Sequence, residues 1–506
     1  MLVTESWRNV KIHLMVLVIL GLAVSACAAP HTTDNDGGPG GMAATAGTDG
    51  VGMGGRQGAA GAPGTGGGVA GASGMSGGGG STGSAGHGSN SGVAGTTGSA
   101  GATGSAGTTG AAGTTGGGSG GDIAGAAGTT DAGGQGATGS AGAGGAGTGS
   151  ACSAGPPSAP TSSAHFPFPQ HRASAVCIYP PACSDDDAAR GWQAFKAART
   201  ISDGTGDGSV RVMRDPSNNN DTYSESIGYG MLFAVYMNDK TTFDNLWKYE
   251  QQHLDPLGLM NWHVNPDNTT SAGETNSATD GDEDMAFAIL MADKQWTGYN
   301  AIATRLLIAI VTYDFASDGT VKGGDTYTAV DPSYLAPAYY RAFAVYAGDT
   351  RWTTILEKSY ATLNSIADPT TGLVPDWSSG RADGGNYTYD ATRTPFRVAL
   401  DACWNKEPRA IAYSQRIGGF FAHSGAANIV DGYTLDGTPV GANHNSSFVG
   451  PAGAAGMAAG QATLVADVYA FVARDARGAN TNYYDGSWAL FTTLLMTGNF
   501  INFAAY

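Results

Sequence analysis

From residue 185 to the C-terminus, one pattern of hydrophobic and polar positions recurs six times. Each unit holds an amphipathic helix, then a loop rich in Asn, Asp, Ser and Tyr, then a helix of small and apolar residues. Apolar residues on one side indicate a helix with one buried face, whereas a helix that is apolar on every side is buried all round. The amphipathic helices are expected at 185–201, 241–254, 298–315, 351–368, 408–425 and 461–476.

The apolar helices are expected to open near residues 224, 277, 331, 390, 444 and 482. Two concentric rings explain the alternation, because outer helices show one face to water while inner helices are covered by the outer ring and the barrel axis. An open helical solenoid is the alternative. Solenoid repeats usually share residues at fixed positions, whereas these units share only the alternation of amphipathic and apolar helices. We therefore predict an all-α fold, a closed (α/α)6 barrel of twelve helices, whose inner helices open at one end.

The segment 277–296 is the most informative inner helix. Ser277 and Thr279 are suited to cap its N-terminus, and carboxylates crowd its first turn. The residues from Met285 to Ala292 leave no polar face, so the helix should be buried on all sides. A buried helix with a carboxylate-rich N-terminus suggests a cleft there, although a capped core helix with solvated acids has the same pattern.

Residues 1–27 have the features of an export signal. Arg8 and Lys11 precede the apolar run 14–23, which is too short to span a membrane as a mature helix. The small residues leading into Cys27 resemble a bacterial lipobox, which would make Cys27 the lipid attachment site. We expect an exported outer-membrane or cell-surface lipoprotein that touches the membrane only through this lipid, with secretion as the alternative.

Residues 28–155 are a low-complexity tract of Gly, Ala, Ser and Thr. The tract has few aromatic or branched apolar side chains to bury, so we predict a disordered linker that serves as a tether. A collagen helix is excluded because the Gly-X-Y period is not kept. Residues 156–506 have a globular composition and suffice for one large core, so we expect one domain, of a size usual for an enzyme, and a monomer.

The net charge of −17 argues against nucleic acid as a partner and permits a neutral or cationic polymer. Four cysteines follow the leader, and in an exported protein they allow three disulfide pairings. Cys177 and Cys183, which flank a Pro-Pro pair, are the favoured partners. Neither a CxxC nor an HExxH spacing occurs, so we expect no metal site, and no organic cofactor is implied.

Carboxylates and aromatic side chains interleave at the openings of the predicted inner helices. They are Glu225, Asp280, Asp282, Asp331, Asp390 and Asp485, with Tyr229, Trp262, Tyr334, Tyr389, Tyr483 and Tyr484. Aromatic faces stack on pyranose rings, and two carboxyl groups, one protonated and one ionised, can cleave a glycosidic bond. A carboxyl group that must stay protonated needs an apolar setting, and Glu225 lies just ahead of an apolar run. The pattern favours a glycosidase, with a noncatalytic carbohydrate-binding module as the alternative.

At these residues the sequence resembles glycoside hydrolase family 8, from about residue 166 to the C-terminus. The segment 278–296, which opens with ATDGD, resembles the signature of that family. The segment 224–231, SESIGYGM, is similar to the one that carries the general acid, although Ser226 stands where Gly or Gln is usual. The segment 389–393, YDATR, resembles the one that carries the general base in the branch with cellulases and some xylanases.

The resemblance implies the (α/α)6 barrel and hydrolysis of β-1,4-glycosidic bonds with inversion. It implies that Glu225 is the proton donor, that Asp390 is the base that activates water, and that Asp280 is a central carboxylate that holds the distorted sugar. Asp280 has sometimes been assigned as a nucleophile in this family. In an inverting enzyme the carboxyl groups of Glu225 and Asp390 should lie about 6.5 to 9.5 Å apart, whereas about 5 Å would favour retention.

The resemblance also implies substrate contacts. Trp262 matches a position that stacks on glucose, although a core tryptophan is possible. Arg393 should pair with a carboxylate or a sugar hydroxyl, and Tyr389 and Tyr484 should line the cleft. Among the other polar residues, Asp282 is expected to cap or support, Asp331 and Asp485 to cap helices, and His444 to reach a sugar or make a structural hydrogen bond.

The expected substrate is therefore a β-1,4-linked polysaccharide, and the leading hypothesis is an endoglucanase that cuts cellulose or a related β-glucan. An endoxylanase is the main alternative, because that branch shares the segment around Asp390. A chitosanase is less favoured, although the acidic balance would suit a cationic substrate. A surface adhesin that grips polysaccharide without cleaving it is the alternative from a different class.

Overall fold

The computed structural model describes residues 155–378, 385–478 and 481–506. The export signal with Cys27 and nearly all of the predicted linker lie outside these residues, so the predictions made for them stay predictions. In the described part of the chain, none of the helices combines the length and the hydropathy needed to span a bilayer.

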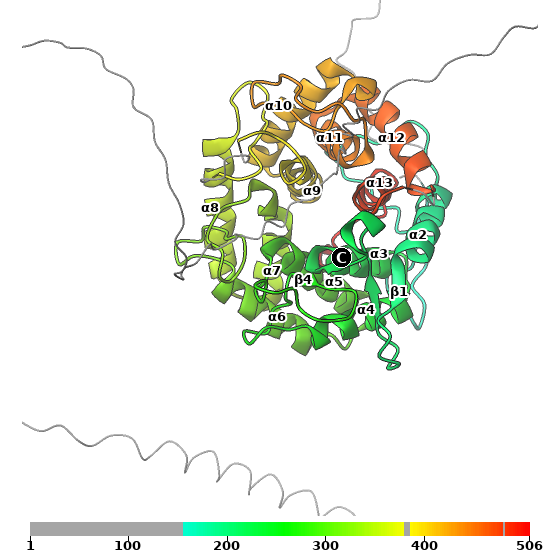
Figure 1. Cartoon of the computed structure of the whole chain (residues 1–506). Coiled ribbons are helices and arrows are strands. Elements are labelled where there is room, and N and C mark those ends of the chain that lie inside the picture. Colours follow the sequence, from blue (N-terminus) through cyan, green and yellow to red (C-terminus); the bar gives the residue numbers. More distant parts are fainter. Residues whose placement is uncertain (1–154, 379–384, 479–480) are drawn as a thin grey trace, which may run out of the picture. The chain divides into compact units, whose positions relative to one another are not determined.

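Twelve α-helices in these residues form two concentric rings (Figure 1). The outer ring consists of α2 (Asp185–Arg199), α4 (Lys240–Gln252), α6 (Asn300–Tyr313), α8 (Arg351–Ile366), α10 (Pro408–Ser424) and α12 (Ala462–Ala476). The inner ring consists of α3 (Ser224–Tyr236), α5 (Thr279–Trp296), α7 (Pro337–Ala347), α9 (Thr394–Asn405), α11 (Ser446–Ala459) and α13 (Tyr483–Met496). Every residue of α3 is buried, whereas α4 buries one face. The rings follow the predicted alternation of apolar and amphipathic helices.

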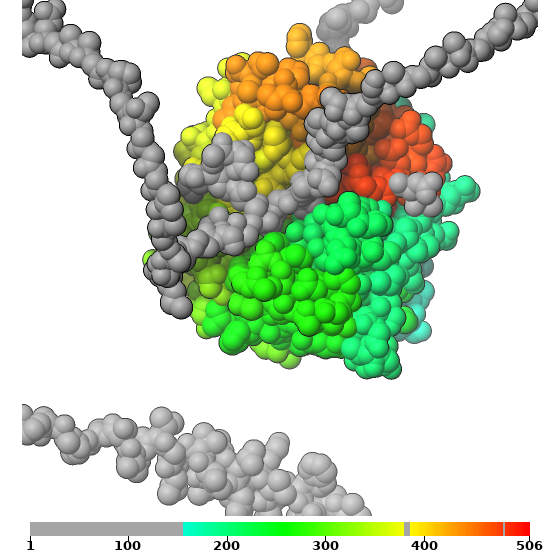
Figure 2. Space-filling model, viewed as in Figure 1, coloured from blue at the N-terminus to red at the C-terminus, as the bar shows by residue number. Residues whose placement is uncertain are grey.

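The barrel closes where the first outer helix meets the last helices of the chain. Helix α2 packs against α12 and α13, and in Figures 1 and 2 the first coloured segment lies beside the red C-terminal helices. The backbone N–H of Ser184 donates to the hydroxyl of Tyr469 at 2.8 Å, and Arg477 pairs with Asp187 at 2.8 Å. These contacts exclude the open solenoid and confirm the closed barrel.

Two glycines let α3 and α5 approach each other closely. A Cβ atom at Gly281 would lie 2.8 Å from the backbone N of Glu225, and one at Gly228 would lie 2.8 Å from the Cβ of Asp284. Real Cβ atoms essentially never come so near, so a larger residue at either position would push the helices apart. The close packing brings the first turns of α3 and α5, with Glu225 and Asp280, to the same place.

Two short antiparallel ladders, which the helical pattern did not predict, lie in the connections. Strand β1 (Thr200–Ser202) pairs with β2 (Val210–Val212), and β3 (Thr222–Tyr223) pairs with β4 (His263–Val264). The backbone N–H of Ser224 also donates to the carbonyl of Trp262 at 2.9 Å. Because β3 runs directly into α3, this ladder ties the segment around Trp262 to the helix that carries Glu225.

Residues 158–172 close the end of the barrel at which the inner helices end. The backbone N–H of His165 donates to the carbonyl of Gln295 at 2.9 Å, near the C-terminus of α5. The amide of Gln170 donates to the carbonyl of Tyr236 at 2.8 Å, at the C-terminus of α3. The segment therefore lies at the opposite end from the openings of the inner helices.

The disulfide expected between Cys177 and Cys183 is wrong. Cys177 is bonded to Cys403 in α9, 226 residues away, with the two Cα atoms 5.3 Å apart. The barrel brings the segment before α2 against an inner helix of the second half of the chain. Short spacing in sequence could not reveal that contact.

The expected capping of α5 is also wrong. The N-cap residue is Ala278, which makes no side-chain capping bond. The hydroxyl of Ser277 donates instead to Asp314 Oδ1 at 2.9 Å, and that of Thr279 donates to the carbonyl of Lys322 at 2.8 Å. Both side chains thus hold the loop after α6 against the start of α5.

Candidate active site

A buried arginine joins four carboxyl groups at the openings of the inner helices. Arg393 Nη1 lies 2.8 Å from Glu225 Oε2 and 2.6 Å from Asp280 Oδ2. Its Nη2 atom lies 3.0 Å from Asp331 Oδ2 and 3.3 Å from Asp390 Oδ1. Four segments that are distant in sequence therefore meet at one guanidinium group.

This cluster holds more acidic than basic groups and little water can reach it. Arg393 is 1% exposed, and each of its four carboxylate partners is at most 5% exposed. Burial raises the pKa of Asp280 and raises that of Asp331 well above its usual range, against the opposing pull of Arg393. Neighbouring carboxyl groups add to both shifts. One cation facing four acids favours shared protons, so protonated and ionised carboxyl groups can coexist here.

Glu225 lies in the first turn of α3, directly after strand β3. The hydroxyl of Tyr483, the first residue of α13, donates to Glu225 Oε1 at 2.9 Å. Arg393 holds the other oxygen, so both oxygens of the carboxyl group are fixed. The N-terminal turn of a helix is also a favourable place for a carboxylate.

Asp390 immediately precedes the short 3-10 helix η3 (Ala391–Arg393). The indole N–H of Trp377 donates to its Oδ2 atom at 2.9 Å. The residue before that tryptophan, Asp376, is also buried, and burial together with the charge of Asp390 raises its pKa to about 7. The sequence reasoning missed both Asp376 and Trp377, because they lie in a connection without periodicity. An adjacent acid and tryptophan in a polar loop was the available signal.

Trp262 stands apart from the main hydrophobic core. It is 5% exposed and packs in a small separate cluster with Tyr223 and Ala278. Its ring meets that of Tyr223 edge to face, with centroids 4.9 Å apart, and lies 5.1 Å from the ring of His263. Trp262 therefore lies outside the main core, beside the β3–β4 ladder that leads to Glu225.

Tyr389 and Tyr484 lie next to each other beside the carboxyl cluster. Their ring centroids are 6.2 Å apart, and the hydroxyl of Tyr484 donates to the carbonyl of Tyr389 at 2.7 Å. The hydroxyl of Tyr389 donates to Asp431 Oδ2 at 2.7 Å. Tyr484 is buried and Tyr389 is half-buried, so the pair forms a fixed aromatic wall next to Asp390.

The structure separates the lesser polar candidates. Asp331 both caps the 3-10 helix η2 (Pro332–Tyr334) and binds Arg393, so it belongs to the cluster as well. Asp282 accepts from the backbone N–H of Met260 at 3.4 Å, and burial raises its pKa well above the usual range. It supports the loop that carries Trp262, in keeping with the supporting role expected for it.

Two further candidates have structural partners. His444 Nδ1 lies 2.7 Å from the carbonyl of Ile429, which supports the structural interpretation of that histidine. The N-cap of α13 is Asn482 and not Asp485, which accepts from the backbone N–H of Ser447 at 3.3 Å. The capping role expected for Asp485 is therefore wrong.

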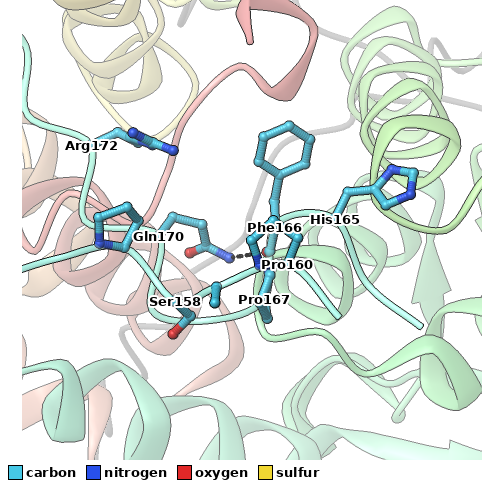
Figure 3. A pocket seen from close by; sticks show the side chains of 9 residues that line it. Ser158, Pro160, His165, Phe166, Pro167, Gln170 and Arg172 are labelled. Atoms are coloured by element: carbon cyan, nitrogen blue, oxygen red, sulfur yellow. Dashed lines mark hydrogen bonds between the residues drawn. The ribbon is translucent and has the colours of Figure 1, made fainter. Parts of the chain in front are cut away.

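Two features besides the carboxyl cluster bear on function, namely a possible metal site and a cavity at the far end of the barrel. Among the described residues, no group of three or more His, Cys, Asp or Glu side chains is arranged to hold a metal ion. A cavity of about 390 Å³ lies in the segment at the far end of the barrel (Figure 3). It is lined by Pro157, Ser158, Ala159, Pro160, His165, Phe166, Pro167, Gln170 and Arg172. That end is about 20 Å from Asp280, measured along α5.

Known proteins are similar to this chain in sequence and in fold. The pattern of glycosyl hydrolases family 8 matches residues 166–498. Endoglucanase A of Acetivibrio thermocellus is 40% identical over 329 residues, which cover 62% of this chain and 69% of that protein. The reducing-end xylose-releasing exo-oligoxylanase Rex8A of Paenibacillus barcinonensis is 30% identical over 317 residues, which cover 56% of this chain and 83% of that protein.

A solved structure has a fold similar to that of this chain. The apo structure of a β-1,3-1,4-glucanase from Paenibacillus sp. X4 superposes with a TM-score of 0.61 at 31% identity, covering 66% of this chain and 98% of that one. The match of the family pattern spans the whole barrel, from before α2 to the end of α13. The chain therefore belongs to glycosyl hydrolases family 8 and is a glycoside hydrolase.

Proposed function

We propose that this enzyme is an endo-β-1,4-glucanase that hydrolyses cellulose or a related β-glucan with inversion at the anomeric carbon. The observation that carries the proposal is the meeting of Glu225, Asp280 and Asp390 at Arg393. The similarity to Endoglucanase A and to a β-1,3-1,4-glucanase supports a glucan as the substrate.

In this proposal Glu225 is the general acid. It gives its proton to the glycosidic oxygen while the bond between that oxygen and the anomeric carbon breaks, and the electron pair leaves with the oxygen. The hydrogen bond from Tyr483 keeps the carboxyl group aimed in one direction. Neighbouring acids that compete for a single arginine favour one protonated carboxyl group in the cluster.

Asp390 is the general base in the same step. It takes a proton from a water molecule that attacks the anomeric carbon from the face opposite to the leaving oxygen. The carboxyl groups of Glu225 and Asp390 are linked through one guanidinium group, so their separation is bounded by two hydrogen bonds and the width of that group. This bound is compatible with the range of about 6.5 to 9.5 Å that leaves room for water.

Asp280 accepts from the same Arg393 nitrogen as Glu225. We assign it to the ring hydroxyls of the sugar at the point of cleavage, where it favours the distorted ring. Trp262 supplies a stacking face for a neighbouring glucose, because it lies outside the core beside the ladder that precedes Glu225. Tyr389 and Tyr484 form the wall on the side of Asp390.

The test is the release of reducing ends by the full chain from carboxymethyl cellulose, mixed-linkage glucan, xylan and chitosan. Glu225→Gln and Asp390→Asn should each lower kcat on the glucans by about 10² to 10⁴, because each removes a proton-transfer group. The first product seen by proton NMR should be the α-anomer, since inversion of a β-linkage creates it.

Asp318→Asn is the matched control, because Asp318 is an exposed carboxylate that pairs with Lys358 outside the cluster. It should leave kcat unchanged. Release from xylan alone would move the assignment to a xylan-degrading enzyme, which the similarity to the exo-oligoxylanase makes the second candidate. Full activity of Asp390→Asn would contradict the assignment of the base.

A further inference from the structure

The loop that carries Asp390 is held on both sides by one buried carboxyl group. Asp376 Oδ1 accepts from the backbone N–H of Thr388 at 2.9 Å and from that of Ala391 at 2.7 Å. Its Oδ2 accepts from the hydroxyl of Thr388. The three bonds bracket Asp390, two residues before it and one residue after it.

The dipeptide of Asp376 and Trp377 also reaches the carboxyl group of Asp390 itself. Trp377 donates its indole N–H to Asp390 Oδ2, while Arg393 donates to Oδ1 from the other side. The indole ring meets the ring of Tyr334 edge to face at 6.0 Å. The backbone N–H of Asp376 donates to the carbonyl of Asn386 at 2.9 Å, which anchors the dipeptide.

Asp390 needs such support because it lies outside the body of a helix. Helix α9 begins only at Thr394, and η3 is a single short turn. A general base must point at the water that it activates, and a misplacement of about 1 Å can cost about 10²-fold in rate. Side chains on loops are held less precisely than those on helices unless other groups fix them.

Asp376 is also a residue whose burial is costly. It is 7% exposed, and burial followed by the nearby charge of Asp390 raises its pKa to about 7. A second acid beside the base adds repulsion, which a stable core would avoid. Its three hydrogen bonds to the loop are the feature that offsets this cost.

We propose that Asp376 is a positioning residue that acts through Asp390, by clamping the backbone on both sides of that residue so that its carboxylate faces the attacking water. The inference rests on the proposed function, in which Asp390 is the base. It assigns no proton transfer to Asp376.

Two variants of Asp376 separate geometry from charge. Asp376→Ala removes the clamp and should lower kcat on mixed-linkage glucan by about 10²-fold, with KM within about 3-fold of the wild type. Asp376→Asn keeps an oxygen that can accept from both N–H groups and should retain at least about a tenth of the wild-type kcat. Equal loss in the two variants would overturn the clamp.

A double variant tests whether the effect passes through Asp390. In the Asp390→Asn background the base is already lost, so adding Asp376→Ala should lower the residual rate by less than about 3-fold. A purely structural role would lower the rate equally in both backgrounds and would overturn the inference. If Asp376→Ala does not fold, the double variant of Asp376→Asn with Asp390→Asn replaces it. A fall in kcat on adding Asp376→Asn that is as large in the Asp390→Asn background as in the wild type would contradict the proposal.

The outcomes also separate this inference from the proposed function. If Asp390→Asn alone keeps full activity, the assignment of the base fails and the inference fails with it. If Asp390→Asn loses activity while Asp376→Ala keeps the wild-type kcat, only the positioning role fails.

Discussion

At the scale of single residues, His263 connects the two strands that lead to the site. Its Nε2 lies 2.9 Å from Asp221 Oδ2 and its Nδ1 lies 2.5 Å from Glu274 Oε2. Asp221 in turn holds Arg214 through two short hydrogen bonds. Burial alone would lower the pKa of His263, but the hydrogen bonds to the two carboxylates outweigh it and raise the pKa above its usual value.

A substitution of His263 should therefore have a pH-dependent cost. The folded-state pKa lies above the unfolded value of about 6.5, so the stabilisation is complete below that pH and is lost as the pH rises through the folded pKa. We expect His263→Gln to lower the free energy of unfolding by about 1.5 to 3 kcal/mol at pH 5.5 and by less at pH 8.5. Urea denaturation at both pH values measures the difference, and an equal loss at both would contradict it.

At the scale of secondary-structure elements, the covalent bond between Cys177 and Cys403 joins the segment before α2 to inner helix α9. Helix α9 follows directly on the turn that carries Asp390 and Arg393. The disulfide closes a loop that contains all four acids of the cluster, together with most of the barrel. It therefore restricts the unfolded chain over much of the domain.

Removal of that disulfide should destabilise the barrel and leave the chemistry nearly intact. We expect Cys177→Ala combined with Cys403→Ala to lower the free energy of unfolding by about 2 to 5 kcal/mol, mainly through greater freedom of the unfolded chain. The kcat of the folded variant at 25 °C should stay within about 2-fold of the wild type, because neither cysteine touches the cluster. Guanidinium denaturation and glucan hydrolysis measure the two quantities, and an unchanged denaturation midpoint would contradict the first.

The elements also show what the sequence could predict. The double ring could be predicted because some helices are apolar on one side and others on all sides. That pattern directly indicates how much of each helix is buried. The sequence placed Glu225, Asp280 and Asp390 near the openings of inner helices, and the structure brings them together at Arg393, while their catalytic roles stay predictions. Asp376 and Cys403 were missed as partners, because their contacts depend on how distant segments pack, and spacing along the chain does not contain that information.

At the scale of the whole molecule, the carboxyl cluster and the segment 158–172 lie at opposite ends of the barrel. Asn499 lies at the second end and is fully buried. Its Oδ1 accepts from the backbone N–H of Gln170 at 2.7 Å, and its Nδ2 donates to Asp185 Oδ1 at 2.7 Å. The amide of Asn499 thus holds the segment 158–172, the first outer helix α2 and the C-terminal residues together.

Asn499→Ala should therefore act on stability alone. It leaves the buried N–H of Gln170 without this acceptor, and we expect a loss of about 1 to 3 kcal/mol in the free energy of unfolding. The kcat of the folded fraction should not change, because the carboxyl cluster lies at the other end of the inner helices. Thermal unfolding and initial rates at 25 °C measure the two effects, and a specific fall in kcat would show that the ends are not independent.

Arg393 couples the ionisation of its four carboxylate partners to one another. Since Glu225, Asp280, Asp331 and Asp390 share one cation, neutralising any one of them leaves a larger share of that charge to the other three. Residues coupled in this way typically show interaction energies of about 0.5 to 3 kcal/mol in double-mutant cycles. An engineer who wishes to move the working pH of this enzyme would therefore have to redesign the four acids as one unit, because no single substitution changes only its own site.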